Sequence, residues 1–172
     1  LSEMVEELLD FSRMQNGKFT LTKGNVDILA ELGDAVLIYT EKAKKEGIEL
    51  VYAEPEDLPA VYGDRNRLRQ VFINVIDNAI KYSEKGGLVT VQAILADENR
   101  IEIEVSDTGC GISPEDLPKI KTKFFRANHN KRGSGIGLAV ADEIITMHSG
   151  TLEVFSEQGM GTTVVIMLPV KK

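Results

Sequence analysis

Residues 133–141 of the chain read GSGIGLAVA, in which three glycines at alternate positions lead directly into a short apolar, helix-forming run. Glycines at the start of a helix let successive backbone N–H groups converge on an anion, and the helix dipole adds partial positive charge there. The spacing is GxGxG rather than the GxGxxG dinucleotide fingerprint, and the sequence contains no GxxxxGK[ST] loop. The stretch therefore predicts a phosphate-binding helix start of another type.

The segment before these glycines is basic. Between residues 119 and 132 there are six basic residues and no acid, although the whole chain carries a net charge of −7. The net charge argues against general nucleic-acid binding, which requires a basic surface. A local cationic segment in an acidic chain instead suggests a small anionic ligand, with a merely solvated loop as the alternative.

The composition is that of an ordinary globular domain. The chain has 172 residues, of which 42% are hydrophobic and 27% charged. Its single cysteine, Cys110, excludes an internal disulfide and fits a reducing compartment. No apolar run approaches the roughly 20 residues of a membrane-spanning helix. Because the first residue is Leu1 rather than Met, we expect a piece of a longer protein.

Hydrophobic periodicity predicts helices and strands in mixed order. The opening residues have a helical pattern that stops at Asn16 and Gly17, and a short extended piece is expected at 19–21. The three main helices are expected at 27–45, 65–83 and 136–147, the second of them capped by Asp64. Strands are expected at 48–54, 88–96, 100–107, 151–156 and 162–168, with a further short one at 61–62. Residues 97–99 join the second and third of these strands and are typical of a hairpin turn. We therefore expect an α+β fold, a two-layer sandwich with helices on one face of a mixed sheet of about five strands.

The helix at 65–83 carries a polar stripe. Asn74, Asn78 and Lys81 are three or four residues apart and so share a helix face. Carboxamide oxygens can bind a hard cation, and an ammonium group can bind phosphate. A solvated helix surface is the alternative reading of this stripe.

A second candidate is SDTGCGIS, residues 106–113. Asp107 ends a predicted strand, where its side chain would project into a cleft, and an ionised carboxylate could accept an exocyclic amine such as adenine N6. Gly109 and Gly111 would let the backbone turn sharply and leave room for a flat ligand. A simple strand-ending turn is the alternative. The Asp-Thr-Gly of aspartic proteases requires a second carboxylate motif, which this sequence lacks.

Taken together, these stretches resemble the nucleotide-binding domain of sensor histidine kinases, within the superfamily that includes gyrase, mismatch-repair and heat-shock-chaperone ATPases. The motifs, in the family's order, are NVIDNAIKYS at 74–83, DTGCGI at 107–112, KFFRAN at 123–128, GSGIGLAVA at 133–141 and GMGTTVVIMLP at 159–169. The likeness covers about residues 19–170. In addition, ELLDFSRMQNGK at 7–18 resembles the end of the second helix of the kinases' dimerisation hairpin. The resemblance therefore implies two parts of the chain, the end of a dimerisation hairpin at 1–18 and an ATP-binding domain at 19–172.

The resemblance implies a Bergerat-type ATP-binding fold with a mobile lid, and the cofactors ATP and Mg²⁺. Asn78 would coordinate Mg²⁺ with support from Asn74, and Lys81 would reach the phosphates. Asp107 would accept the adenine amine, and Thr162 would join the water network beneath the base. The other nucleotide-binding residues that it implies are Tyr82, Gly109, Gly111, Ile112, Phe124, Phe125, Arg126, Gly133, Ser134, Gly135, Ile136, Gly137 and Leu138. Among these, Phe124 and Phe125 would anchor the lid, and Arg126 would approach the γ-phosphate as a catalytic residue beside Asn74 and Lys81.

The implied activity is transfer of the γ-phosphoryl group of ATP to a histidine on the dimerisation hairpin, and from there to an aspartate of a response-regulator receiver domain. The hairpin, the receiver domain and a second copy in a homodimer are the expected partners. The implied setting is cytoplasmic, in a bacterial sensor held at the membrane by segments outside this chain. Only His129, in the expected lid, and His148, at a helix end favoured by the dipole, are present. Neither lies on a dimerisation helix, so we expect no autophosphorylation of this chain alone.

Two other functions remain open at this point. Related ATPases and the serine kinases of the anti-sigma-factor type carry a glutamate where this chain has Asn74, and an asparagine cannot activate water as a base. We therefore expect slow ATP hydrolysis. A module that senses nucleotide without transferring phosphate is the third possibility.

Overall fold

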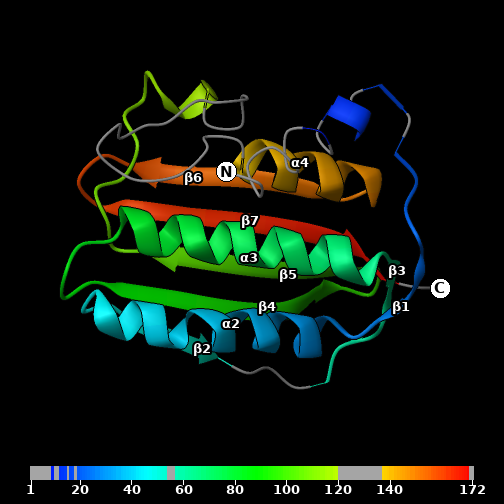
Figure 1. Cartoon of the computed structure of the whole chain (residues 1–172), viewed down its shortest axis with the longest axis horizontal. Helices are drawn as coiled ribbons and strands as arrows, with labels where there is room; N and C mark the ends of the chain where they lie inside the picture. The colour runs from blue at the N-terminus through cyan, green and yellow to red at the C-terminus, as the bar shows by residue number, and fades with distance from the viewer. Residues whose placement is uncertain are drawn as a thin grey trace.

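The computed structural model describes residues 9, 12–14, 16, 17, 19–53, 57–119 and 137–170. Its centre is a five-stranded mixed sheet in the order β2-β4-β5-β7-β6, and helices α2, α3 and α4 cover one face of it (Figure 1). This confirms the predicted α+β, two-layer arrangement. The strands of this sheet are β2 Glu49–Ala53, β4 Leu88–Asp97, β5 Arg100–Asp107, β6 Thr151–Glu157 and β7 Gly161–Pro169. The helices are α2 Ile28–Lys45, α3 Arg65–Tyr82 and α4 Gly137–Met147, with a short 3-10 helix η1 at Leu117–Lys119.

A second, two-stranded sheet was not predicted as such. Strand β1, Gly24–Val26, pairs antiparallel with β3, Val61–Gly63. The extended piece expected at 19–21 is not part of it, since the strand begins at Gly24. Each strand has three residues, too few for a period-2 pattern to stand out in the sequence.

The core forms because strand side chains alternate between the two faces of the sheet. The inward residues of β4, β5 and β7 are buried against the helices; they are Val89, Val91, Ala93, Ile101, Ile103, Val105, Val164, Ile166 and Leu168. Strands β4 and β5 form the hairpin that the sequence predicts, and Asp97 closes its turn by accepting a hydrogen bond from Asn99 N at 2.8 Å. Within the described ranges, no helix combines the length and the apolar character needed to cross a membrane.

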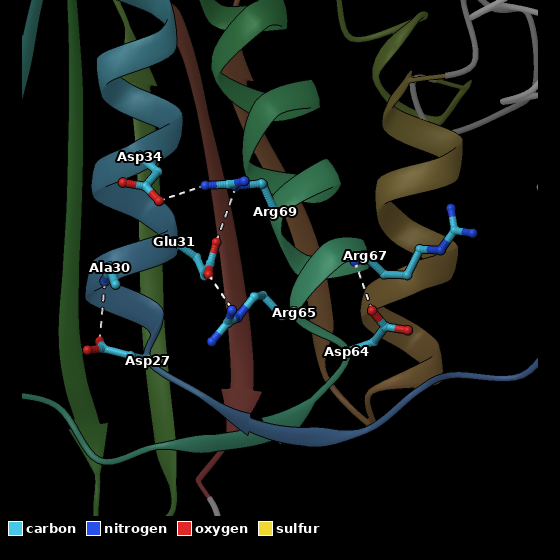
Figure 2. Close-up of polar contacts among 8 residues, drawn as sticks. All are labelled: Asp27, Ala30, Glu31, Asp34, Asp64, Arg65, Arg67 and Arg69. Carbon is cyan, nitrogen blue, oxygen red and sulfur yellow. Dashed lines mark hydrogen bonds and ion pairs between the residues drawn. The ribbon is translucent and has the colours of Figure 1, made fainter.

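Both long helices begin at an aspartate cap. Asp27 Oδ1 accepts a hydrogen bond from Ala30 N at 3.2 Å, and Asp64 Oδ1 accepts one from Arg67 N at 3.2 Å (Figure 2). The predicted cap at Asp64 is thus confirmed. Such a side chain satisfies one of the N–H groups that a helix leaves unpaired at its start.

An ion-pair cluster joins the first halves of α2 and α3 (Figure 2). The buried carboxylate of Glu31 lies 3.2 Å from Arg65 Nε and 3.2 Å from Arg69 Nε. Arg69 Nη2 also lies 2.6 Å from Asp34 Oδ2 on the exposed side of α2. Because the buried carboxylate faces two guanidinium groups, the cluster fixes the spacing of the two helices above the sheet.

His148 joins the end of α4 to the start of α3. Its side chain is buried, Nδ1 lies 2.7 Å from Ile144 O, and Nε2 accepts the N–H of Asp64 at 2.9 Å. The imidazole occupies the space beside Gly63, where a Cβ atom would lie 2.6 Å from His148 Cδ2. Burial lowers the pKa of this imidazole, which disfavours the charged form. The helix-end position is confirmed, but the dipole explanation is wrong, because it requires a positive charge that this neutral, hydrogen-bonded ring does not carry.

Candidate nucleotide-binding site

A pocket opens where α3 passes over the end of β5. It encloses about 440 Å³, counting the open space at its mouth. Seven residues that the sequence analysis singled out line it, from four separate stretches of chain: Asn78, Tyr82, Asp107, Gly111, Ile112, Leu138 and Thr162. The rest of the lining is small and apolar: Val75, Ala79, Val105, Val154 and Val164. The pocket thus combines apolar walls, suited to a flat ring, with a few polar groups that can fix its orientation.

Asp107 is the principal polar group of the pocket wall. It is the last residue of β5 and is half-buried, and its Oδ1 accepts the N–H of Gly109 at 2.9 Å. Burial raises the pKa of this carboxyl, and backbone hydrogen bonds from Gly109 and Thr162 oppose that rise. The carboxylate is therefore held in one orientation at the edge of the pocket, where its acceptor character can select a hydrogen-bond donor.

The loop after β5 depends on its two glycines, though partly for a reason that the sequence did not indicate. A Cβ atom on Gly109 would lie 2.1 Å from the carbonyl oxygen of Tyr82 at the end of α3. Gly111 has φ +71°, and its Cβ would lie 2.2 Å from the carbonyl of Glu157. Gly111 lines the pocket as expected, whereas Gly109 is required for backbone packing against α3.

The three residues of the polar stripe on α3 each have different surroundings. Asn78 lines the pocket, and Asn74 Nδ2 donates to the carbonyl of Gly137, at the first turn of α4, over 3.3 Å. Lys81 Nζ lies 2.7 Å from Asp77 Oδ2, one turn earlier on the same helix. The stripe is therefore real, but its lysine is paired with a carboxylate rather than directed at the pocket.

Two residues of this region were missed by the sequence analysis. Asp77 Oδ1 lies 3.1 Å from Lys42 Nζ on α2, so Asp77 is shared between Lys42 and Lys81. The i,i+4 spacing of Asp77 and Lys81 was a usable signal. Nothing in the sequence pointed to Lys42, which comes from another helix.

Ser156, on β6, was also missed. Its Oγ lies within hydrogen-bond distance of Ile112 N, Gly161 O and Thr162 Oγ1. It therefore joins two residues of the pocket lining, Ile112 and Thr162. Its only sequence signal is its place at the end of a strand.

The arrangement suits a divalent ion that is held mainly by a phosphate ligand. Within the described ranges, no three acidic, histidine or cysteine side chains lie close enough together to hold a metal. Mg²⁺ in phosphate-binding sites commonly takes only one or two protein oxygens and completes its shell with phosphate and water. The carboxamide oxygens of Asn78 and Asn74 fit that requirement, since the amide nitrogen of Asn74 is already engaged by Gly137.

The expected lid lies outside the described residues. This applies to Phe124, Phe125, Arg126, His129, Gly133, Ser134, Gly135 and Ile136. Gly137 and Leu138, which follow them, begin α4, and Leu138 contributes to the pocket.

Comparison with known proteins identifies the family of this chain. The sequence profile of the family described as "Histidine kinase-, DNA gyrase B-, and HSP90-like ATPase" matches residues 63–172. "Histidine kinase P4" of Formosa agariphila is 34% identical over 98% of this chain and 13% of its own length. "Adaptive-response sensory kinase SasA" of Synechococcus elongatus is 33% identical over 99% of this chain and 44% of its own length. This chain therefore spans less than half the length of either relative.

Solved structures share the fold. Full-length ShkA, crystallised in complex with AMPPNP, superposes with a TM-score of 0.86 and 29% identity, over 99% of this chain and 36% of that one. The profile match covers the pocket-bearing elements from α3 to β7, which are the elements that the sequence motifs identified. The chain belongs to the family of histidine kinase-, DNA gyrase B- and HSP90-like ATPases.

Proposed function

We propose that this chain is the ATP-binding catalytic domain of a sensor histidine kinase. The observation that carries the proposal is the convergence of Asp107, Thr162 and Asn78 on one pocket with apolar walls. Support also comes from relatives that are named as kinases and from a similar structure that was solved with an ATP analogue. Residues 19–172 form this domain in the proposal, and residues 1–18 end a dimerisation hairpin.

The base of ATP would occupy the apolar part of the pocket. Asp107 accepts a hydrogen bond from the exocyclic amine, and Thr162 contributes a second polar contact, directly or through water. Tyr82, Ile112 and Leu138 contact the ring, and their positions in the lining support these roles.

The triphosphate and Mg²⁺ would lie toward the start of α4. Asn78 supplies an oxygen to the ion and Asn74 supports its water shell. Lys81 neutralises phosphate charge once it leaves Asp77, and Lys42 remains there as a counter-ion for that carboxylate. Phosphoryl transfer depends mainly on positioning and charge neutralisation, which these groups would provide. The lid roles of Phe124, Phe125, Arg126, Gly133, Ser134, Gly135 and Ile136 stay predictions.

The acceptor histidine would come from elsewhere. His148 is buried and both of its ring nitrogens are engaged in hydrogen bonds, so it cannot attack a phosphoryl group from this position. In the proposal the acceptor lies on the dimerisation hairpin of a homodimer, and the phosphoryl group then passes to a response-regulator aspartate. Asn74, whose amide donates to Gly137, offers no base to activate water, which favours transfer over hydrolysis.

The test has two stages. Titration calorimetry of this chain with ATP should show binding that strengthens with Mg²⁺, and Asn78→Ala should remove most of that Mg²⁺ dependence. A histidine-bearing hairpin from a related kinase should then become labelled when it is mixed with this chain and radiolabelled ATP. Binding without label transfer would favour a nucleotide sensor, and rapid hydrolysis without transfer would favour an ATPase. Label on this chain alone would contradict the proposed source of the acceptor.

A further inference from the structure

A row of three polar residues crosses the sheet at the base of the pocket. Asp107 on β5 is in register with Thr162 on β7, and Thr162 is in register with Ser156 on β6. Side chains two residues apart on a strand share a face. The row therefore lies on the face of Val105, Val164 and Val154, all of which line the pocket.

The hydrogen bonds of Ser156 determine which way each hydroxyl points. Ser156 Oγ lies 2.8 Å from Ile112 N, 2.9 Å from Gly161 O and 2.8 Å from Thr162 Oγ1. A backbone N–H only donates, a carbonyl oxygen only accepts, and a hydroxyl has a single hydrogen. The hydrogen of Ser156 is therefore used by Gly161. It follows that in the contact between Ser156 and Thr162, the threonine is the donor.

The threonine hydroxyl then has no hydrogen left for the pocket. Its oxygen can offer only lone pairs to a ligand or to a water molecule. Beside it, the carboxylate of Asp107 is also an acceptor when it is ionised. Asp107 and Thr162, which are paired across β5 and β7, therefore present two hydrogen-bond acceptors to the pocket. Neither side chain offers a donor there.

We propose that Ser156 is a positioning residue for base selection, because it holds the Thr162 hydroxyl as an acceptor toward the ligand. This rests on the proposed function of the pocket as an ATP site. An amino group on the purine carries two hydrogens and can satisfy both acceptors, directly or through water. A carbonyl at the same ring position would face them with its own lone pairs. Ser156 therefore contributes to the preference for a 6-aminopurine over a 6-oxopurine without touching the base.

Ser156 also has a structural role that the test must separate. Its oxygen accepts the N–H of Ile112, so loss of the hydroxyl weakens the loop after β5 as well. A weaker loop would lower the affinity for any purine nucleotide. Loss of the Ser156 hydroxyl would also let the Thr162 hydroxyl reorient. That change would alter the ratio of the affinities for ATP and inosine triphosphate, because the two bases differ at ring position 6.

The chain offers a matched control. Ser106 Oγ lies 2.7 Å from Thr163 Oγ1, a second serine–threonine pair between neighbouring strands. Each of these residues is adjacent to a member of the polar row, so the pair lies on the opposite face of the sheet. Ser106→Ala therefore removes a similar hydrogen bond from the same sheet without altering the pocket wall.

The experiment measures the dissociation constants of ATP and inosine triphosphate by calorimetry on this chain. The unsubstituted chain should prefer ATP, and Ser156→Ala should reduce that preference about fivefold, the equivalent of one neutral hydrogen bond. Ser106→Ala should leave the ratio unchanged. Thr162→Val should also reduce the preference, and in that background Ser156→Ala should have no further effect on the ratio.

The outcomes are distinguishable. An equal loss of both affinities in Ser156→Ala would overturn the inference and leave Ser156 a purely structural residue. If Ser156→Ala does not fold, an unchanged ratio in Thr162→Val would still overturn the inference, because Ser156 is proposed to act through Thr162. A chain that binds neither nucleotide would overturn the proposed function as well. A chain that prefers ATP with a ratio insensitive to Ser156 would overturn only the positioning role.

Discussion

Replacing Asp107 by asparagine alters one atom of the pocket wall and keeps its shape. The oxygen of the asparagine would still accept the N–H of Gly109, which lies 2.9 Å from Oδ1 in the structure. The amide NH₂ would then take the place of the second carboxylate oxygen. A donor would therefore face the amine of the base, where the aspartate presents an acceptor.

The expected loss is that of a hydrogen bond to a charged group, about 1.5–3 kcal/mol. This corresponds to a dissociation constant for ATP that is roughly 10- to 150-fold higher. The fold itself should not suffer. Because burial raises the pKa of Asp107 in the folded state, its favourable contribution to stability exists at low pH and is lost as the pH rises through that pKa. At neutral pH the nucleotide-free Asp107→Asn variant should therefore melt at the same temperature as the unsubstituted chain or higher.

Calorimetry with ATP and a thermal melt without nucleotide test both parts of this prediction. The affinity of the unsubstituted chain should also fall as the pH is lowered through the raised pKa of Asp107, whereas that of the variant should stay nearly constant. Unchanged affinity in Asp107→Asn would refute the reasoning, because the amine of the base could then not meet this carboxylate. A large loss of stability would show that the polar contacts of Asp107 matter more for folding than its burial.

The remaining predictions concern packing and ion pairs. Gly109→Ala should severely reduce both the free energy of unfolding and nucleotide binding, because the new Cβ would lie 2.1 Å from a backbone carbonyl oxygen. Gly24→Ala is the control: nothing lies within 4 Å of a Cβ at that position, so its denaturant melt should match that of the unsubstituted chain. His148→Gln should lower the free energy of unfolding by about 1–3 kcal/mol at neutral pH. Because burial lowers the pKa of His148 in the folded state, its contribution to stability is lost as the pH falls below 6.5. In urea melts, the difference in free energy of unfolding between the variant and the unsubstituted chain should therefore shrink toward pH 5. A difference that stays constant with pH would contradict this account. Glu31→Gln should lower the free energy of unfolding in low-salt urea melts by about 1–2 kcal/mol, while the exposed Asp34→Asn should change it by less than about 0.5 kcal/mol; equal effects would show that burial of the Glu31 carboxylate is immaterial.

The parts of the fold that the sequence predicts are those with a repeated local signal. The alternation of residues 88–96 and 100–107 predicted the β4–β5 hairpin, and Asp64 before an amphipathic run predicted the start of α3. The pairing of β1 with β3 was missed, because three-residue strands have no periodicity and depend on tertiary contact.

The site residues that could be predicted are those that combine a side chain suited to ligand binding with a recognisable place in a predicted helix or strand. Asp107 at a strand end and Asn78 on a helix stripe are unusual enough to be noticed, and the structure brings both into one pocket. Ser156 and Lys42 were not predictable, because each matters only through a partner that is distant in the sequence. The partner of Lys81 was overlooked for another reason: the motif directed attention to a phosphate rather than to the carboxylate one turn away.

The contact between His148 and Gly63 has a consequence for the evolution of this fold. The imidazole fills the volume that any side chain at position 63 would need, and its Nε2 holds the backbone of the next residue. The two positions are therefore not free to drift separately: among homologues, a larger residue at 63 should occur only together with a smaller one at 148. A homologue that kept the histidine while gaining a bulky residue at 63 would have to shift the end of α4 away from the end of β3 and the start of α3.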